Sequence, residues 1–215
     1  GTNATLELRA DKMALSGGTI GNAATDVVLL RPANLTDAID VGSGVDTTAD
    51  TLELSDGELD TITGLLTIGT TGVTGGITVT GAVDTLNVTD LSLVAGSAVN
   101  DGGGTAGITE ANLTIDADDG VSFTGSGNAV GALDVTNNTS GNIAFTNAAA
   151  MTVTGVNNVA GGTLSVTNNG GTTSTAAGGI TTTGTGAANI SITSSGDVTL
   201  GHDVTAGDTG AVTVR

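Results

Sequence analysis

The sequence predicts an all-β solenoid of roughly ten coils. The first observation is a short recurring phrase: an apolar residue, a small or polar residue, a second apolar residue, Thr, then Gly or Asn. Five consecutive copies lie at 121–125, 133–137, 143–147, 151–155 and 164–168. The two apolar side chains of each copy fall on one face of a strand, and Gly or Asn can adopt the left-handed backbone of a sharp corner.

The second observation is that the spacing of the copies varies. Successive copies begin 8 to 13 residues apart, so the turns differ in length while the strand phrase is kept. Two apolar side chains bury too little surface to offset the ordering of about ten residues at ~1–2 kcal/mol each. Each strand must therefore stack on copies of itself, as in a solenoid with variable loops.

The third observation is the composition. The chain of 215 residues has no Trp, Tyr or Cys, only two Phe, and an apolar fraction of 38% with a mean hydropathy of +0.26. This apolar content argues against disorder, and the lack of aromatic residues favours a thin core of Val, Ile, Leu and Ala. At ~20 residues a coil and ~4.8 Å between strands, the rod would be roughly 50 Å long.

Individual elements follow from local patterns. Leu6 with Leu8, and Met13 with Leu15, predict two short strands near the N-terminus. Further strands are predicted at 27–30, 35–41, 51–54, 65–68, 77–80, 86–89 and 113–116. Beyond residue 167 the phrase weakens but persists at 180–183, 190–193, 198–200 and 212–214.

Two segments depart from the strand pattern. Ser55 and Glu58 form a capping-box signature, which predicts a single helical turn. The run 100–104, with three consecutive Gly, predicts a flexible loop between coils. No linker is evident, so residues 1–215 are expected to form one continuous domain.

The charge balance restricts the partners. Net charge is −18, with 22 acidic and four basic residues, and 18 of the acidic residues lie at or before Asp119. Nucleic acids and anionic lipids require clustered Lys and Arg, so neither is expected as a partner. The longest apolar runs are too short to span a membrane, and the absence of Cys is consistent with secretion.

Several segments resemble a known family. These segments are 27–32, 38–42, 52–62, 65–69, 162–167 and 196–201. They are similar to the repeat blocks of large bacterial exoproteins of the filamentous-haemagglutinin type, and the resemblance covers most of the chain. It implies a right-handed parallel β-helix at or released from a bacterial surface, serving adhesion or as structural material such as biofilm matrix. Because the chain does not begin with Met, we expect a processed product or a segment of a longer exoprotein.

One cluster of carboxylates could bind a metal ion. Asp116, Asp118 and Asp119 fall within five residues and precede Gly120, which suits a hard cation such as calcium. The cluster lacks the spacing and the distal Glu of an EF-hand loop, and a solvated acidic turn is the alternative. Calcium is therefore the candidate cofactor of this sequence.

Catalytic chemistry is not expected. The one His, His202 beside Asp203, is more typical of a solvated turn than of a catalytic triad. β-Helical glycosidases and lyases use carboxylates together with aromatic sugar platforms, and Trp and Tyr are absent here. We predict that the protein is not an enzyme.

The leading functional hypothesis is an extracellular structural protein. Neither end resembles a polar cap, so end coils with free strand edges would allow identical subunits to stack end to end into filaments of a surface fibre, sheath or adhesin. The alternative is a binding module, an adhesin or ice-binding solenoid, whose lateral face contacts a surface or carbohydrate. Thr78 with Thr80 and Thr152 with Thr154 motivate the ice-binding version.

Overall fold

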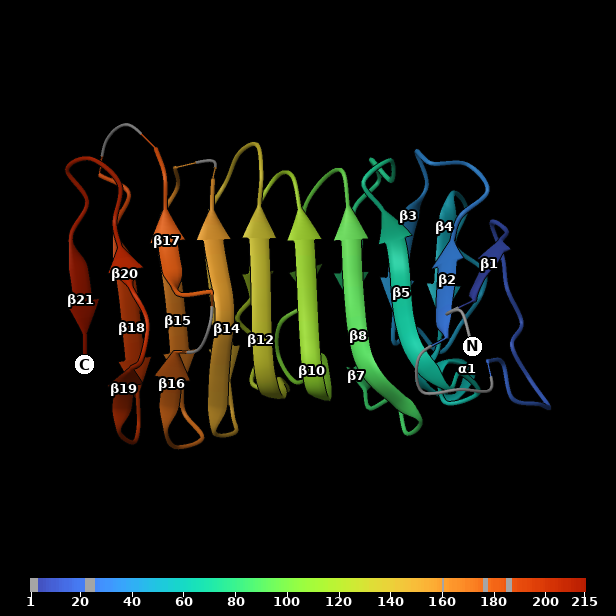
Figure 1. The fold of residues 1–215 in the computed structure, drawn as a ribbon. Coiled ribbons are helices and arrows are strands. Elements are labelled where there is room, and N and C mark those ends of the chain that lie inside the picture. The colour runs from blue at the N-terminus through green and yellow to red at the C-terminus, as the bar shows by residue number, and fades with distance from the viewer. Residues whose placement is uncertain (1–3, 22–25, 160, 176–177, 185–186) are drawn as a thin grey trace.

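The computed structural model describes residues 4–21, 26–159, 161–175, 178–184 and 187–215. In this part of the chain, strands alternate with turns, and the one helix is α1 (Asp56–Leu59). All strand pairs are parallel, and the strands form two sheets that face each other along a rod (Figure 1). The architecture is a parallel β-solenoid of about nine turns, close to the ten expected. Its right-handed winding stays a prediction.

Twelve strands form the first sheet. Its main path runs through β1 (Thr5–Arg9), β2 (Val27–Arg31), β5 (Gly64–Thr70), β8 (Val88–Ala95), β10 (Gly107–Ala117), β12 (Ala129–Asn137), β14 (Met151–Asn158), β16 (Thr173–Thr175) and β19 (Val198–Leu200). Three short strands flank it: β7 (Ala82–Val83), β17 (Ile180–Thr182) and β20 (Val204–Thr205). The register is regular in the middle, where Leu113 pairs with Leu133, one coil of 20 residues later.

Nine strands form the second sheet. From the C-terminal edge they are β21 (Val212–Val214), β18 (Ile190–Ser194), β15 (Leu164–Asn168), β13 (Ile143–Asn147), β11 (Val121–Phe123), β9 (Val99–Asp101), β6 (Ile77–Val79), β3 (Ala38–Val41) and β4 (Thr51–Leu54). Strand β4 forms the N-terminal edge of the second sheet although it follows its neighbour β3 in the sequence. After β3 the chain adds β4 on the outer side and only then continues to β5 in the first sheet.

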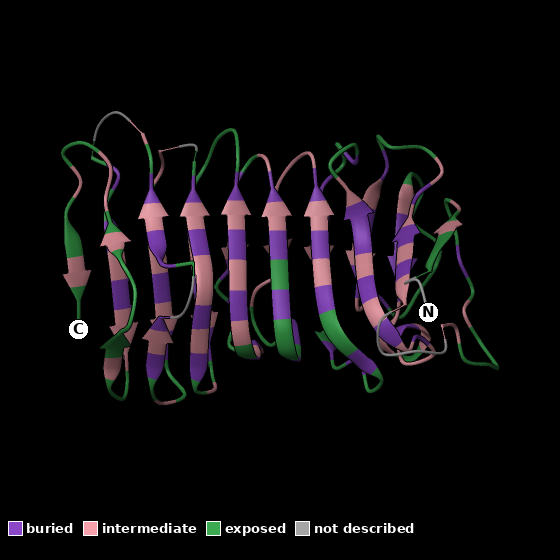
Figure 2. Cartoon of the chain, in the orientation of Figure 1, coloured by how far each residue is buried: buried purple, intermediate pink, exposed green. Residues whose placement is uncertain are grey.

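The core is a stack of aliphatic side chains between the sheets. Buried and partly exposed residues alternate along strands of the second sheet, and Figure 2 shows a similar alternation of buried and intermediate residues along much of the front sheet. The two Phe side chains, Phe123 and Phe145, are paired in register and stack with ring centroids 5.7 Å apart. The thin aliphatic core expected from the composition is confirmed.

All five central copies of the repeating phrase form strands, but the role predicted for their last residue is wrong. Asn137, Asn147 and Asn168 are completely buried and face inward, two positions after the second apolar residue. They do not adopt left-handed backbone, which among the described non-glycine residues occurs only at Asp50 and Asp208. Side-chain hydrogen bonding, not backbone geometry, explains why Asn stands there.

Local predictions had mixed outcomes. The helical turn is confirmed, since the Glu58 carboxylate accepts hydrogen bonds from the backbone and hydroxyl of Ser55 at 2.9 and 2.7 Å. The predicted strand at Met13 and Leu15 is absent from the described chain there, where the segment is irregular. The strand predicted at 86–89 begins instead at Val88, because Leu86 lies in a turn with 71% of its surface exposed.

The loop predicted at 100–104 is only partly correct. Asn100 and Asp101 belong to β9, and the bend and turn that follow lie at 103–105. The carboxylate of Asp101 accepts hydrogen bonds from the backbone N–H of Gly125 at 2.7 Å and from the Asn128 amide at 3.2 Å. This segment is therefore tied to the next coil.

Candidate functional site at the ends of the solenoid

The C-terminal end leaves inward-facing apolar side chains exposed. Val212 and Val214 continue the buried positions of Ile190 and Ile192 in the neighbouring strand, yet they are 43% and 41% exposed, against 1% and 0%. Leu200 at the edge of the first sheet is 47% exposed. Figure 2 shows this end coloured mostly as exposed. Among the described residues, β19 and β21 are the last strands of the two sheets at this end, and no further strand pairs with their outer edges.

The N-terminal end of the second sheet is covered. Leu52 and Leu54 of edge strand β4 have no exposed surface. Residues 10–20 lie over this end: the Lys12 ammonium forms an ion pair with the Asp46 carboxylate at 3.0 Å, and the Leu15 N–H donates to the Glu58 carboxylate at 3.1 Å. The expectation that neither end is capped is therefore wrong for this half of the N-terminal end.

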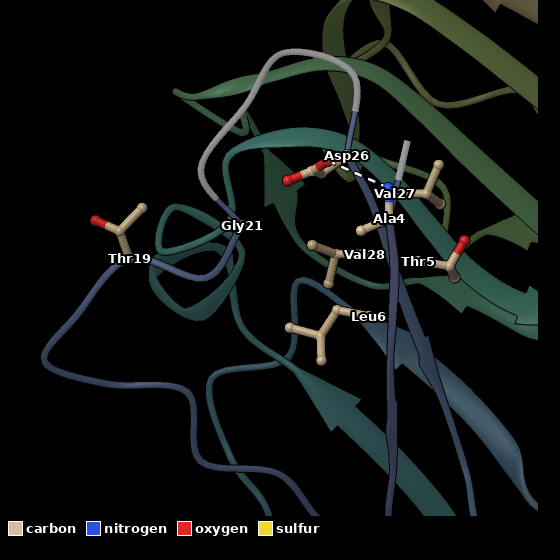
Figure 3. Close-up of a pocket in the computed structure, with 8 residues that line it drawn as sticks. All are labelled: Ala4, Thr5, Leu6, Thr19, Gly21, Asp26, Val27 and Val28. Carbon is tan, nitrogen blue, oxygen red and sulfur yellow. Dashed lines mark hydrogen bonds between the residues drawn. The ribbon is translucent and has the colours of Figure 1, made fainter. Parts of the chain in front are cut away.

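The N-terminal end of the first sheet remains open. Leu6 of edge strand β1 is 45% exposed and borders a groove of about 500 Å³. Figure 3 shows Leu6 and Val28 side by side on this groove, with Asp26 accepting a hydrogen bond from the Ala4 N–H at 3.3 Å. A second hollow of about 280 Å³ is lined by 7–10 and 13–15, mainly by apolar side chains.

Acidic groups near the N-terminal end are perturbed by burial and by one another. Burial raises the pKa of Asp37, and the charges of Asp11 and Asp50 raise it further, while a hydrogen bond from Asn34 partly offsets the shift. The pKa of Glu53 is lowered instead, chiefly because the Thr48 backbone N–H donates to it at 2.9 Å.

A buried acid also lies in the middle of the rod. Glu110 is 8% exposed and accepts hydrogen bonds from the backbone N–H and the hydroxyl of Thr85. Burial raises the pKa of Glu110, and these hydrogen bonds only partly offset it. Burial likewise raises the pKa of Asp134 on strand β12. Nothing in the sequence pattern distinguishes these two acids from the exposed ones.

The predicted calcium ligands do not converge. Asp116 lies in β10, where its carboxylate accepts a hydrogen bond from the Asn138 amide at 2.7 Å. The Asp119 carboxylate, in the turn, accepts one from the Ser140 hydroxyl at 2.9 Å. Among the described residues, no three His, Cys, Asp or Glu side chains lie together as a metal site would require. Asp118 contributes through its backbone, with its N–H donating to the Ser97 carbonyl at 3.1 Å.

His202 and Asp203 lie at a shallow polar hollow of about 210 Å³ near β17 and β20. The hollow also contains Thr181 and Thr205, and the backbone N–H of His202 donates to the Thr175 hydroxyl at 3.1 Å.

The lateral face of the second sheet carries short polar side chains in register. One outward row is Asn100, Ser122, Ala144, Ser165, Ser191 and Thr213. A second row joins Thr146, Thr167 and Thr193. The two Thr pairs noted in the sequence do not extend as Thr rows: Thr78 is flanked by Asp40 and Asn100, and Thr152 by Ala132 and Ser174.

Comparisons with known proteins give no relative. No protein-family model, curated protein or solved structure matches the chain. Within the described residues, no helix is long and apolar enough to cross a membrane. Any functional argument therefore rests on the geometry of the solenoid itself.

Proposed function

We propose that this protein is a non-catalytic structural protein of the extracellular space or cell surface, a β-solenoid subunit of a fibre, sheath or adhesin that stacks end to end. One observation carries the proposal: the inward apolar positions of the terminal coil are exposed although equivalent positions in the neighbouring coil are buried. A further layer of parallel strands would cover these side chains, and in the proposed filament a second molecule supplies it.

The energetics favour such a contact. Burying a Val or Leu side chain completely contributes about 1.5–3 kcal/mol, and Leu200, Val212 and Val214 retain nearly half of their exposure. The free strand edge adds backbone hydrogen bonds of ~0.5–1.5 kcal/mol each. The contacting surfaces differ and lie at opposite ends of the rod, so a contact that repeats along the rod axis stays open and generates a filament.

Sedimentation velocity of the 215-residue protein over a range of concentrations tests this proposal. The wild type should form species larger than one chain, whereas Leu200→Glu should require on the order of tenfold or more protein, because a carboxylate would enter an apolar contact. Leu86→Glu is the matched control, since Leu86 is a 71% exposed leucine on the side of the rod. A strictly monomeric wild type, or equal effects of both variants, would contradict the proposal.

A second candidate is a lateral-face binding module for ice, a surface or a carbohydrate. The in-register Ser and Thr rows of the second sheet, free of charge from β11 to β18, favour it. This function predicts discrete rods that inhibit ice recrystallisation or bind polysaccharide. Replacing Thr146 and Thr167 with Lys should abolish that activity without altering sedimentation.

Calcium binding at Asp116, Asp118 and Asp119 remains a proposal of its own. Isothermal titration of calcium chloride into the wild type and into Asp118→Asn tests it. A saturable heat that the variant loses would support the site, and no heat in the wild type would reject it.

A further inference from the structure

The chain contains a single Asn-Gly pair, Asn169-Gly170, at the corner that follows strand β15. Every other Asn precedes a residue that carries a side chain. Such a side chain hinders attack by the next backbone nitrogen on the Asn amide carbon, and glycine removes this hindrance. Asn169 and Gly170 are both exposed, so water can reach them. This pair is therefore the place in the chain where an Asn side chain can cyclise with least hindrance.

Packing between two coils requires the glycine of this pair. A Cβ atom at position 170 would overlap the carbonyl group of Ala148 and the backbone nitrogen of Ala149 in the preceding coil. The backbone N–H of Asn169 also donates to the Asn147 carbonyl of that coil at 2.8 Å. The reactive pair is thus part of the stacking itself.

The preceding residue, Asn168, holds the nitrogen that would attack. The Gly170 N–H donates to the side-chain oxygen of Asn168 at 2.9 Å. Asn168 is completely buried, and its amide is fixed by the Thr172 carbonyl at 2.9 Å and the Thr173 hydroxyl at 3.0 Å. To close a ring, the Gly170 nitrogen must give up its proton and turn toward the Asn169 amide carbon. Both events break its bond to Asn168.

We propose that Asn169 is a site of spontaneous deamidation, and that the Asn168 side chain slows the reaction by holding the Gly170 N–H. In the reaction, the Gly170 nitrogen forms a bond to the Asn169 amide carbon. The carbon–nitrogen bond of the side-chain amide breaks, and its nitrogen leaves as ammonia with the proton from Gly170. Water then opens the resulting succinimide at either carbonyl, which yields aspartate or isoaspartate.

The product would change this part of the rod in two ways. The sequence has no charged residue between Asp134 and Asp197, so the new carboxylate would be the first charge in that stretch. Isoaspartate would also lengthen the backbone by one carbon atom at the point where residue 170 lies against Ala148. Deamidation should therefore loosen the corner between β15 and β16, and this consequence does not depend on end-to-end assembly.

Ageing the folded protein in mildly alkaline buffer tests the proposal. Fragmentation mass spectrometry of the intact chain locates and quantifies the mass gain, and wild type unfolded in urea gives the unprotected rate. The folded wild type should react at residue 169 more slowly than the unfolded chain. Asn168→Ala should accelerate the folded-state reaction by on the order of tenfold, because one hydrogen bond is lost. Asn169→Gln should show no mass gain at this position.

Leu91→Ala is the control for lost stability, since Leu91 is buried in strand β8, in a different sheet from Asn169. This variant should leave the folded-state rate unchanged. Equal acceleration in Leu91→Ala and Asn168→Ala would overturn the role of Asn168, as would equal rates in folded and unfolded wild type. A mass gain that appears first at another Asn would overturn the assignment of the site.

Hydrogen exchange decides the case in which Asn168→Ala does not fold. In the wild type, the Gly170 N–H should exchange more slowly than in an unstructured peptide, because Asn168 accepts its hydrogen bond. Exchange at the peptide rate would overturn the proposed protection.

Discussion

The two halves of the rod share one strand arrangement but differ inside and outside. In strands β2, β5 and β8 the buried inward side chains are aliphatic, and most acidic residues of the chain lie on this half. From β12 onward, inward positions include Asn137, Asn158, Asn168, Thr175 and Thr182, all buried. The stacked strands therefore accommodate both an aliphatic interior and an interior that includes buried Asn and Thr side chains.

The aliphatic interior requires only close contact, whereas the polar interior requires complete hydrogen bonding. Asn137 illustrates this: its carbonyl accepts from the Gly120 N–H at 2.8 Å, and its amide donates to the Ser140 carbonyl and to the Asn158 side chain, both at 2.9 Å. In the described residues, no buried side-chain nitrogen or oxygen lacks a partner. The buried Asn side chains thus supply hydrogen-bond partners to backbone groups in the corners that would otherwise lack them.

The largest effect is expected in the aliphatic half. Leu91→Ala removes a side chain that is 1% exposed between Leu66 and Leu113, and it should lower the free energy of unfolding by about 2–5 kcal/mol. Urea denaturation monitored by circular dichroism measures the change. Leu86→Ala, at a largely exposed position, should cost less than ~0.5 kcal/mol; similar losses in both variants would contradict the register.

In the polar half, adjacent asparagines provide a matched pair. Asn168 is buried, its amide donates to the Thr172 carbonyl at 2.9 Å, and its carbonyl accepts from the Gly170 N–H at 2.9 Å. Asn168→Ala should cost about 1–3 kcal/mol because these groups lose their partner. Asn169→Ala, at the exposed next position, should be close to neutral in the same denaturation experiment. Equal costs would show that the buried amides do not support the corners.

The buried acids predict an unusual pH dependence. The pKa of Glu110 is raised in the folded state, so the native protein binds a proton before the unfolded chain does, and stability should rise as pH falls from 7 toward the ordinary value of 4.5. The raised pKa of Asp134 acts in the same direction, and the lowered pKa of Glu53 opposes it only at lower pH.

Thermal unfolding at pH 7, 6 and 5 measures this dependence. The midpoint should rise on acidification in the wild type and rise less in Glu110→Gln, which keeps an acceptor for Thr85. Asp90→Asn, at an exposed position, serves as the control for the change in net charge. A wild-type midpoint that falls steadily from pH 7 to 5 would show that burial of Glu110 is not costly.

The smallest effect is expected at Thr175, a buried polar residue that pairs in register with Val153 of β14 and Leu200 of β19. Thr175→Val loses the hydrogen bond that the His202 N–H donates to the hydroxyl, but it gains a methyl group among apolar neighbours. The two contributions nearly cancel, so we expect a change within about 1 kcal/mol. A larger loss, measured by urea denaturation, would place Thr175 among the required polar contacts.

Much of the fold could be predicted because the repeated phrase directly encodes strand alternation. The pattern 121–125 and its four relatives are strands, and the capping box at Ser55 is a helical turn. The inward role of Asn was missed because Gly and Asn share the phrase's last position for different reasons. At Gly125 a Cβ would lie 2.8 Å from the Ala106 carbonyl oxygen of the neighbouring coil, whereas Asn137 and Asn147 accept backbone hydrogen bonds through their side-chain amides.

The candidate site was harder to predict, because exposure at an end depends on register. In the sequence, Leu6 and Leu200 look like any other strand residue. Only the pairing of nine strands shows that they lie at the two ends of one inward-facing row of the first sheet. Met13 and Leu15 alternate like a strand, yet in space they cover the end of the second sheet, since burial there needs no ladder partner. Sequence periodicity carries no information on such long-range placement.

Electron microscopy of the purified protein, combined with diffraction from aligned material, tests the central claim most directly. Head-to-tail stacking predicts unbranched filaments one solenoid wide with a ~4.8 Å repeat along the filament axis, because the strands lie across that axis. Leu200→Glu should leave single rods of the same width. Discrete wild-type rods, or filaments whose 4.8 Å repeat runs across the axis, would contradict the account.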